Sequence, residues 1–571
     1  MKYDICIVGS GAGASPVAYT LAKAGAKVLI LEKGPWLTEK EFFKDELAIS
    51  LRDAYNPKLS DEQHVIEELY QDQNGEAYWQ GEPTSESGWS FWNGNVVGGS
   101  SNFMSGYFHR LKPIDFKLKS EFGEIEGANV EDWPITYEEL EPYYAKVERE
   151  IGVSGKVVQH PFQEPRSSDF PYPPVLEHPV ASWIDKAAKL IGYHAIPVPR
   201  AILSRPAMGR NSCEYSGYCS SYGCSSGAKG DARAALLNHA VATGNLTIIP
   251  NAKVYHLSSN ESGEVTGVNY YDSAGRKRLV SANIYVVACQ AIETSRLLLA
   301  SKSKKFPNGL ANNNGQVGKN LVFSAGGTGQ GDFSYDQLTE QKQAELKQVG
   351  PFINRALQDW YQINDKNFNG ANQQGKAKGG TIDFLFYQNP IARARGTERD
   401  ENGELMWGKQ LQAALHKEFT SYKTLRFEVF NDWLPTDDCF VTLDQETTDK
   451  WGDPVAKVRI GAHGHDLLVG EYLAEKGAKL LEAMGAENIS TSVSSYPPTN
   501  LMAGGCRFGV DPKTSVLDKN CRAHEVNNLY VTDGSFMPTG GSVPYTFTIY
   551  ANAFRVAEHI KRLWKQVSLK P

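Results

Sequence analysis

A glycine-rich turn near the start of the chain, GSGAGA at residues 9–14, constrains the fold more than any other feature. An apolar run at residues 3–8 precedes this turn, and apolar residues at helical spacing follow it up to residue 26. A second apolar run, residues 27–34, contains Glu32. This order of strand, turn, helix, strand and acid is typical of a βαβ unit that binds a dinucleotide. The sequence therefore predicts an α/β fold that begins with such a unit.

Each residue type in this unit has a physical reason. Gly9 permits the tight turn, and Gly11 lets the backbone approach a pyrophosphate at the N-terminus of the helix. Ala14 replaces the third glycine and still permits close packing of the helix on the strand. Glu32 is placed to accept hydrogen bonds from an adenosine ribose. The alternative is an ordinary βαβ unit without a ligand.

Composition and charge exclude several classes of protein. With 41% hydrophobic and 22% charged residues, the chain is neither disordered nor fibrous. Its net charge of −7, without a Lys/Arg block, offers no footprint for nucleic acid. No apolar run reaches the roughly 18 residues of a membrane span, so no transmembrane segment is expected. The first residues also lack the basic and apolar regions of a signal peptide.

Apolar periodicity predicts the remaining elements. Predicted helices cover residues 58–71, 231–244, 466–484 and the C-terminal stretch with Ile549, Ala553, Val556, Ile560 and Leu563 on its buried stripe. Predicted strands cover residues 246–256, 264–271, 381–387 and 424–443. Residues 284–301 are predicted as a strand that runs into a helix.

Three further segments carry a family resemblance: VVGGSSN at 96–102, VVACQAIETSRLLLAS at 286–301, and the C-terminal NLYVTDGSFMP and TFTIYANAFRVAEHI. Together with the first turn, they resemble the glucose-methanol-choline (GMC) flavin oxidoreductases along nearly the whole chain. The resemblance implies FAD and an α/β fold. A discontinuous, Rossmann-like FAD-binding βαβ domain would be joined by an α+β substrate domain built on an antiparallel sheet. The FAD-binding domain would comprise residues 1–50, 88–110, 200–325 and 502–571, and the substrate-binding domain residues 51–87, 111–199 and 326–501.

The resemblance also implies the residues that contact FAD. The segment after the second glycine pair is Asn102-Phe103-Met104, where some relatives have a histidine bound covalently to the flavin, so non-covalent FAD is expected. The implied FAD-binding positions are Gly9, Gly11, Ala14, Glu32, Gly98, Gly99, Ser100, Asn102, Val254, Asp533 and Pro544.

Three cysteines, Cys213, Cys219 and Cys224, lie close together in one loop at 213–224. The loop resembles one in a subgroup of sugar dehydrogenases in this family, where three cysteines hold a three-iron, four-sulfur (3Fe–4S) cluster, although the second gap is one residue longer here. Such a cluster needs three converging thiolates, whereas a closed zinc site needs a fourth ligand that is not near in sequence. One disulfide with a free thiol, or three unmodified cysteines, are the alternatives.

The positions of the usual catalytic residues are occupied by other types. Family members have a histidine base at the head of the segment that reads LMAGGCRFG here, so Leu501 takes its place. The second usual residue, which holds the alcohol oxygen, is replaced by Pro544. Asn500 enters the site if the alignment shifts by one residue, and Tyr545 can serve in proton transfer if a positive charge lowers its pKa. The next candidates are His463 and His465, expected in the loop before the 466–484 helix.

The resemblance predicts a dehydrogenase that oxidises a hydroxyl of a sugar or glycoside, similar to glucose, gluconate 2- and glucoside 3-dehydrogenases. Hydride would pass to FAD, and electrons would leave through the 3Fe–4S cluster to a cytochrome or other partner. An oxygen-using oxidase of the same family is one alternative. The other is a flavoprotein subunit with non-standard or no alcohol chemistry. A small signal-bearing subunit would deliver the chain to the periplasm, with cytoplasmic residence as the alternative.

Overall fold

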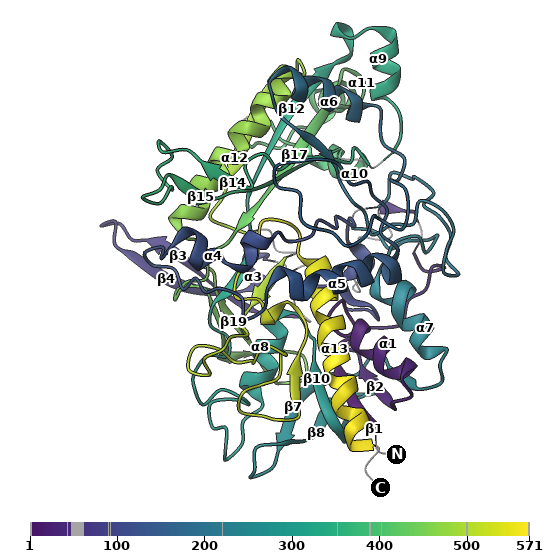
Figure 1. The fold of residues 1–571 in the computed structure, drawn as a ribbon. Helices are drawn as coiled ribbons and strands as arrows, with labels where there is room; N and C mark the ends of the chain where they lie inside the picture. Colours follow the sequence, from purple (N-terminus) through teal and green to yellow (C-terminus); the bar gives the residue numbers. More distant parts are fainter. Residues whose placement is uncertain are drawn as a thin grey trace.

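The computed structural model describes residues 3–42, 44–46, 62–89, 91, 93–219, 221–350, 352–386, 390–400, 402–497 and 501–568. Two lobes share one chain (Figure 1). A parallel sheet with helices α1, α8 and α13 forms the lower lobe in this view, and an antiparallel sheet with α12 and α6 forms the upper lobe. No helix within these residues is long and apolar enough to cross a membrane.

The parallel sheet has the strand order β22-β10-β1-β2-β6. β1 and β2 are buried along most of their length and apolar on both faces, as is typical of strands in a parallel sheet. The strands are β1 (Tyr3–Val8), β2 (Val28–Leu31), β6 (Leu246–Ile249), β10 (Ala282–Val287) and β22 (Leu529–Val531). The helices are α1 (Ser15–Lys23), α8 (Ala291–Ala300) and α13 (Thr546–Ser568). The predicted βαβ unit, the strand–helix at 284–301 and the C-terminal helix are confirmed.

The antiparallel sheet has the main order β20-β12-β17-β16-β13-β5, with β11 joined to β17 and β21. Its strands are β5 (Ala195–Pro197), β11 (Leu321–Ala325), β12 (Gly327–Ser334), β13 (Arg355–Leu357), β16 (Gly380–Phe386), β17 (Tyr422–Asp432), β20 (Glu487–Val493) and β21 (Met502–Gly504). One face packs its apolar residues against α12 (Gly464–Ala483) and α6 (Val180–Leu190). The opposite face, which includes Glu428, turns to the parallel-sheet lobe.

Two smaller sheets complete the fold. One contains β7 (Lys253–Ser259), β8 (Val265–Tyr271) and β9 (Lys277–Val280), and the other contains β18 (Phe440–Thr448), β19 (Pro454–Arg459), β3 (Val65–Gln71) and β4 (Ala77–Pro83). The remaining helices and strands are α3 (Thr84–Ser87), α4 (Leu118–Phe122), α5 (Tyr137–Val147), α7 (Asn238–Val241), α9 (Glu340–Leu346), α10 (Pro390–Gly396), α11 (Gly408–Thr420), β14 (Gln362–Asn364) and β15 (Lys376–Lys378). Sheet membership separates the predicted FAD-binding and substrate-binding segments except at β11 and β21, and the boundaries themselves stay a prediction.

Three predicted elements were wrong. The strand predicted at 246–256 is two strands, because Pro250 lacks an N–H and Asn251 adopts a positive φ of 53°. The strand predicted at 424–443 is also interrupted, between β17 and β18, in a segment that contains Pro435. The helix predicted at 58–71 is wrong, because the described part of this segment contains strand β3, whose two edges pair with β4 and β19.

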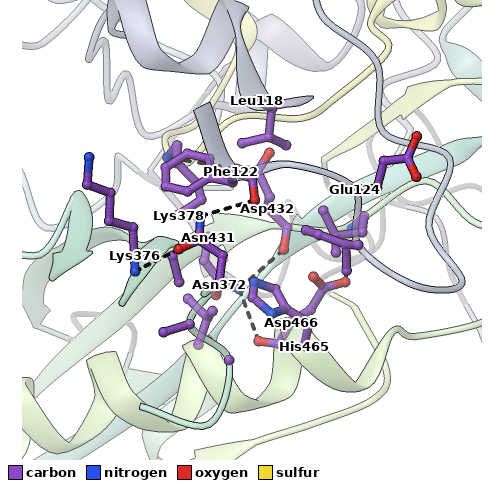
Figure 2. Close-up of a pocket in the computed structure, with 16 residues that line it drawn as sticks. Leu118, Phe122, Glu124, Asn372, Lys376, Lys378, Asn431, Asp432, His465 and Asp466 are labelled. Atoms are coloured by element: carbon purple, nitrogen blue, oxygen red, sulfur yellow. Dashed lines mark hydrogen bonds and ion pairs between the residues drawn. The ribbon is translucent and has the colours of Figure 1, made fainter. Parts of the chain in front are cut away.

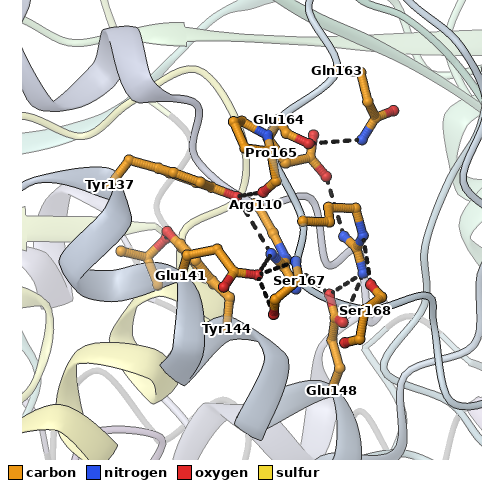
Figure 3. Close-up of polar contacts among 12 residues, drawn as sticks. Arg110, Tyr137, Glu141, Tyr144, Glu148, Gln163, Glu164, Pro165, Ser167 and Ser168 are labelled. Carbon is orange, nitrogen blue, oxygen red and sulfur yellow. Dashed lines mark hydrogen bonds and ion pairs between the residues drawn. The ribbon is translucent and has the colours of Figure 1, made fainter.

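A buried charge network holds the proline-rich segment after α5 in place (Figure 3). The Arg110 guanidinium, almost fully buried, donates to Glu148 at 3.0 Å and to Glu141 at 2.8 Å. Arg166 donates to the second oxygen of Glu148 at 2.7 Å. Because each carboxylate is matched by a guanidinium, the network avoids the cost of an unpaired buried charge. It fixes α5, which packs against the C-terminal helix α13.

Candidate active site

A cavity of about 870 Å³ lies between the two lobes. On one side it is lined by the turns that follow β1, β2, β10 and β22, which all leave the parallel sheet at its carboxyl edge. Ligands bind at this edge in open α/β sheets. On the other side the cavity is lined by residues of β12, β16 and β17 from the antiparallel sheet. One continuous space therefore connects a dinucleotide site with a second wall of different architecture.

The turn after β1 is shaped for a phosphate group. Gly9 has a φ of 90°, and a Cβ atom there would lie 2.3 Å from the carbonyl oxygen of Ala288. A Cβ on Gly11 would meet no atom within 4 Å, so this backbone faces open space. The N–H groups of Gly11, Ala12 and Gly13 make no hydrogen bond within the described residues. Unpaired N–H groups in the turn that leads into α1 are suited to bind a pyrophosphate.

Glu32 ties three segments together at the end of β2. Its carboxylate accepts hydrogen bonds from the Ser10 hydroxyl at 2.5 Å and from the Gly34 N–H at 2.9 Å. The same hydroxyl accepts from the N–H of Gly98 at 2.9 Å. Burial raises the pKa of Glu32 above its ordinary value, although both hydrogen bonds act in the opposite direction. Glu32 lines the cavity, as its predicted contact with a ribose requires.

The second glycine segment packs directly on the first. Gly99 has a φ of 59°, and a Cβ atom there would lie 3.1 Å from the Cα of Gly11. Gly99 and Ser100 line the cavity, whereas Gly98 and Asn102 do not. The Asn102 amide donates to the carbonyl of Val97 at 3.1 Å and to that of Gly99 at 2.9 Å. Asn102 therefore holds the turn in shape and does not face the cavity as predicted.

The other predicted FAD-binding residues divide in a similar way. Val254, Asp533 and Pro544 line the cavity, while Ala14 is fully buried where α1 packs on the sheet. The Asp533 carboxylate accepts from the N–H groups of Gln290 at 3.0 Å and of Ser535 at 2.9 Å. Burial raises the pKa of Asp533, and these bonds partly offset the shift. The phosphate turn, the ribose carboxylate and the open space between them fit FAD.

The antiparallel wall carries ionisable groups that sequence reasoning missed. Glu428 on β17 is the cross-strand partner of Thr328 on β12 and of Asp383 on β16, so the three side chains share one face. Glu428 lines the cavity and is partly exposed to it. Burial, and secondarily the negative charge of Asp383, raises the pKa of Glu428 to about 7. The only signal in the sequence is the alternation of Arg426 and Glu428 with apolar residues, which does not distinguish a cavity from bulk solvent.

The comparisons with known proteins identify the family. Residues 175–324 and 435–553 match GMC oxidoreductase domains. The chain is 30% identical to 2-methyl-1,2-propanediol dehydrogenase of Mycolicibacterium austroafricanum, over 99% of this chain and 96% of that protein. The chain belongs to the GMC oxidoreductase family. This confirms the resemblance and makes the chain an FAD-dependent oxidoreductase that acts on CH–OH groups.

Other relatives in the GMC family span the chain as well. Paromamine 6′-oxidase of Streptomyces fradiae is 30% identical, over 98% of this chain and 91% of that protein. The fructose dehydrogenase large subunit of Gluconobacter japonicus is 26% identical, over 99% of both chains. A variant of formate oxidase from Aspergillus oryzae has a TM-score of 0.60 at 17% identity, over 99% of both chains, which confirms the fold.

The catalytic positions of this GMC member differ from the predicted roles. Leu501 and Tyr545 both line the cavity, and Asn500 lies outside the described residues. The phenol of Tyr545 is 1% exposed, and its oxygen has no hydrogen-bond partner within the described residues. Burial raises the pKa of Tyr545 well above its ordinary value, and no positive charge in the described part of the chain lowers it. Tyr545 is therefore a hydrogen-bond donor at neutral pH, and the base role allowed by the sequence does not hold.

The two candidate histidines lie at a different cavity. His465 lines a smaller space of about 190 Å³, together with Lys378 and Asp432 (Figure 2). The Nε2 of His463 donates to the carbonyl of Glu126 at 2.9 Å, and its Nδ1 accepts from the N–H of His465. Burial lowers the pKa of His465 to about 4. Neither histidine lines the large cavity, although both stand at the start of the predicted helix α12.

The three clustered cysteines are free thiols in one small apolar cluster with Ile202 and Phe352. Cys219 lines the large cavity, and Cys213 and Cys224 do not. Across the described residues, no group of three or more His, Cys, Asp or Glu side chains is arranged to hold a metal. Burial raises the pKa of Cys213 to about 12 and also raises that of Cys219. The described residues therefore do not support the expected 3Fe–4S cluster.

Proposed function

We propose that this GMC oxidoreductase is a dehydrogenase that oxidises a hydroxyl of a sugar or glycoside, with FAD bound non-covalently. The observation that carries the proposal is the single cavity that joins the phosphate turn to the polar antiparallel wall. The similarity to paromamine 6′-oxidase and to the fructose dehydrogenase large subunit supports a sugar-like substrate. Bound FAD supplies the acceptor for the hydride that leaves the alcohol carbon.

The residues of this chain divide the remaining work. The N–H groups around Gly11 hold the pyrophosphate, and Glu32 holds the ribose. The hydroxyl of Tyr545 has no hydrogen-bond partner among the described residues, and in this proposal it donates to the substrate oxygen. Leu501 and Phe430 contribute apolar wall and keep water from the reacting carbon.

The side chains beside the second glycine segment support non-covalent binding. Phe103 lines the cavity and packs edge-to-face on Phe42, with ring centroids 6.0 Å apart. Neither Phe103 nor Met104 has a nitrogen nucleophile that can attach to the flavin. Acid precipitation is expected to release all of the yellow flavin into the supernatant, and flavin retained in the pellet would contradict this part of the proposal.

The substrate class is tested by anaerobic bleaching of the bound flavin. A panel of hexoses, glycosides, aminoglycosides and simple diols is added, and the loss of absorbance near the flavin maximum is followed. Bleaching by sugars or glycosides at low concentrations supports the proposal. Bleaching by simple alcohols alone would reassign the substrate, and a flavin that no member bleaches would favour a subunit without alcohol chemistry.

The dehydrogenase and the oxidase alternative differ in the electron acceptor that they use. The similarity to paromamine 6′-oxidase favours the oxidase alternative. We expect the reduced protein to reduce a dye or cytochrome at least about ten times faster than oxygen, a rate difference of about 1.4 kcal/mol in barrier. Rapid oxygen consumption with stoichiometric peroxide would assign an oxidase.

The proposed transfer of electrons from the reduced flavin to an acceptor does not include an iron–sulfur cluster, because the described cysteines do not support one. Iron analysis and low-temperature EPR of anaerobically purified protein are expected to show no bound cluster. Three iron atoms per chain, absent in Cys213→Ser, would instead show that the cluster is present and that electrons can leave through it.

A partner subunit and periplasmic location complete the proposal. The relative from Gluconobacter japonicus is a large subunit, which supports a further subunit for this chain as well. We propose that this partner is small, carries the signal and delivers the chain, and that a cytochrome accepts the electrons. Fractionation of cells that express the chain with and without neighbouring genes tests both points. Periplasmic activity only in the presence of those genes supports delivery by a partner, and activity confined to the cytoplasm in both cases rejects it.

A further inference from the structure

The carboxylates that line the large cavity fall into two groups. Four of them are paired: Glu32 with Ser10 and Gly34, Glu293 with His64 and Arg296, Asp453 with Lys253, and Asp533 with Gln290 and Ser535. The fifth, Glu428, makes no hydrogen bond or ion pair within the described part of the chain. Its carboxylate is therefore the one with free capacity to accept a proton.

Charges of both signs surround Glu428 and shift its pKa in opposite directions. Asp383 lies beside it on β16 and is engaged by His109 at 3.2 Å. Arg426 on the same strand and Arg200, which lies beside the antiparallel sheet at Asn354, bring positive charge. The Arg200 guanidinium donates to Asn354 and Ser105 and stacks 3.9 Å from the centre of the Tyr107 ring, so it does not neutralise Glu428 by direct pairing.

The other candidate bases are excluded by their surroundings. Leucine at position 501 and proline at 544 accept no proton, and the buried phenol of Tyr545 holds its own. No histidine is found among the described residues that line this cavity. Among the described residues that line the cavity, Glu428 is the only unpaired carboxylate that an alcohol entering from the antiparallel side meets.

We propose that Glu428 is the general base of this enzyme. The inference rests on the proposed alcohol oxidation and assigns its proton. The hydroxyl proton moves to the Glu428 carboxylate while the C–O bond becomes a carbonyl, and the carbon-bound hydrogen leaves with its electron pair as hydride for the bound flavin. Glu428 then returns its proton to solvent through the cavity, to which it is partly exposed.

The ionisation of Glu428 gives the proposal a pH signature. Only the ionised carboxylate accepts a proton, so flavin reduction rises with pH until the pKa of about 7 and is constant above it. The raised pKa of Glu428 also makes the stability of the fold depend on pH. The folded-state pKa exceeds the ordinary value of 4.5, so this group stabilises the fold at pH below that value and loses the contribution as pH rises through about 7.

The experiment compares the holoenzyme with Glu428→Gln, Glu428→Asp and the matched control Glu487→Gln, an exposed carboxylate on β20 outside the cavity. Anaerobic stopped-flow flavin reduction is measured from about pH 5.5 to 8.5 with the best sugar. Glu428→Gln is expected to slow reduction by about 10²- to 10⁴-fold and to lose the inflection near pH 7, with normal flavin content. Glu428→Asp keeps the inflection at a reduced rate, and Glu487→Gln matches the wild type.

Thermal unfolding supplies a second readout that needs no substrate. The Tm of Glu428→Gln relative to wild type is expected to rise between about pH 5 and pH 8, because only the wild type acquires the buried charge. A Tm difference that is independent of pH, or wild-type reduction rates in Glu428→Gln, would overturn the assignment. A loss seen only in KM would make Glu428 a binding residue. Failure of the wild type to reduce its flavin with any alcohol would instead overturn the proposed function itself.

Discussion

The two walls of the large cavity both carry carboxylates, but the carboxylates have different surroundings. On the parallel-sheet wall, Glu32 and Asp533 are buried carboxylates whose oxygens are occupied by neighbouring N–H and hydroxyl donors. On the antiparallel wall, Glu428 is a carboxylate without such donors, beside a second carboxylate, Asp383. The first arrangement fixes charge and geometry, whereas the second leaves a group free to change its protonation state.

This difference matches the residence times of the two ligands that the cavity is proposed to hold. A cofactor remains bound through many reaction cycles, so preorganised backbone groups and saturated carboxylates suit it. A substrate proton is taken and released in every cycle, which requires an ionisable group close to half-ionised at the working pH. Changes on the parallel wall are therefore expected to affect FAD, and changes on the antiparallel wall are expected to affect the reaction.

The largest effect is expected from Gly11→Val. The Cβ atom added at this position meets no protein atom within 4 Å, so we expect the protein to fold, while the side chain fills the space proposed for the pyrophosphate. Bound FAD is expected to fall below about one tenth per chain, measured by absorbance after gel filtration, with an unchanged circular dichroism spectrum. Gly396→Val is the matched control, because Gly396 at the end of α10 is equally open and remote from the cavity. Full flavin content in Gly11→Val would place the pyrophosphate elsewhere.

A smaller effect on the same wall is expected from Glu32→Gln. The amide accepts from one of its two donors and turns an N–H₂ group toward the other, so the turn loosens. The dissociation constant of FAD is expected to rise about tenfold, measured by titration of the apoprotein. The pH dependence of flavin reduction at saturating FAD should match that of wild type. A changed pH dependence of flavin reduction in Glu32→Gln would contradict the assignment of FAD binding to one wall and proton transfer to the other.

Tyr545→Phe tests the donor at the junction of the walls. Loss of one hydrogen bond of about 1 kcal/mol to the substrate oxygen is expected to slow flavin reduction by about fivefold to tenfold. FAD content should not change, because the phenol makes no hydrogen bond that holds the described fold. Reduction at the wild-type rate would remove Tyr545 from the mechanism.

The smallest effect is expected from Leu501→Ala. This side chain contributes apolar wall and no polar group, so its loss weakens substrate contact more than chemistry. KM for the best sugar is expected to change by up to about fivefold with a nearly constant kcat, measured in steady-state dye assays. A large fall in kcat at unchanged KM would show that Leu501 orients the reacting groups.

The parallel wall was predictable because its information is local. The glycine turn, its flanking strands and Glu32 lie within 3–34, and each has a fixed offset from the next. The antiparallel wall was not predictable, because it assembles Arg200, Asp383 and Glu428 from distant parts of the chain. Alternating polar residues on β17 indicate a strand with one polar face but not what lies opposite that face. The base could be found only after the pairing of β12, β16 and β17 was known.

Two hydrogen bonds, from Gly541 and Ser542 to Asp432, join strand β17 to the loop that leads to Tyr545. Asp432, the last residue of β17, accepts from the N–H of Gly541 at 2.6 Å, in the loop that leads to Tyr545. Glu428 lies on the same strand, four positions earlier, so an extended strand of about 13 Å connects base and loop. Any hinge motion that shifts β17 must carry the loop with it. Glu428, the proposed proton acceptor, and Tyr545, the proposed hydrogen-bond donor, would then move toward or away from a substrate together.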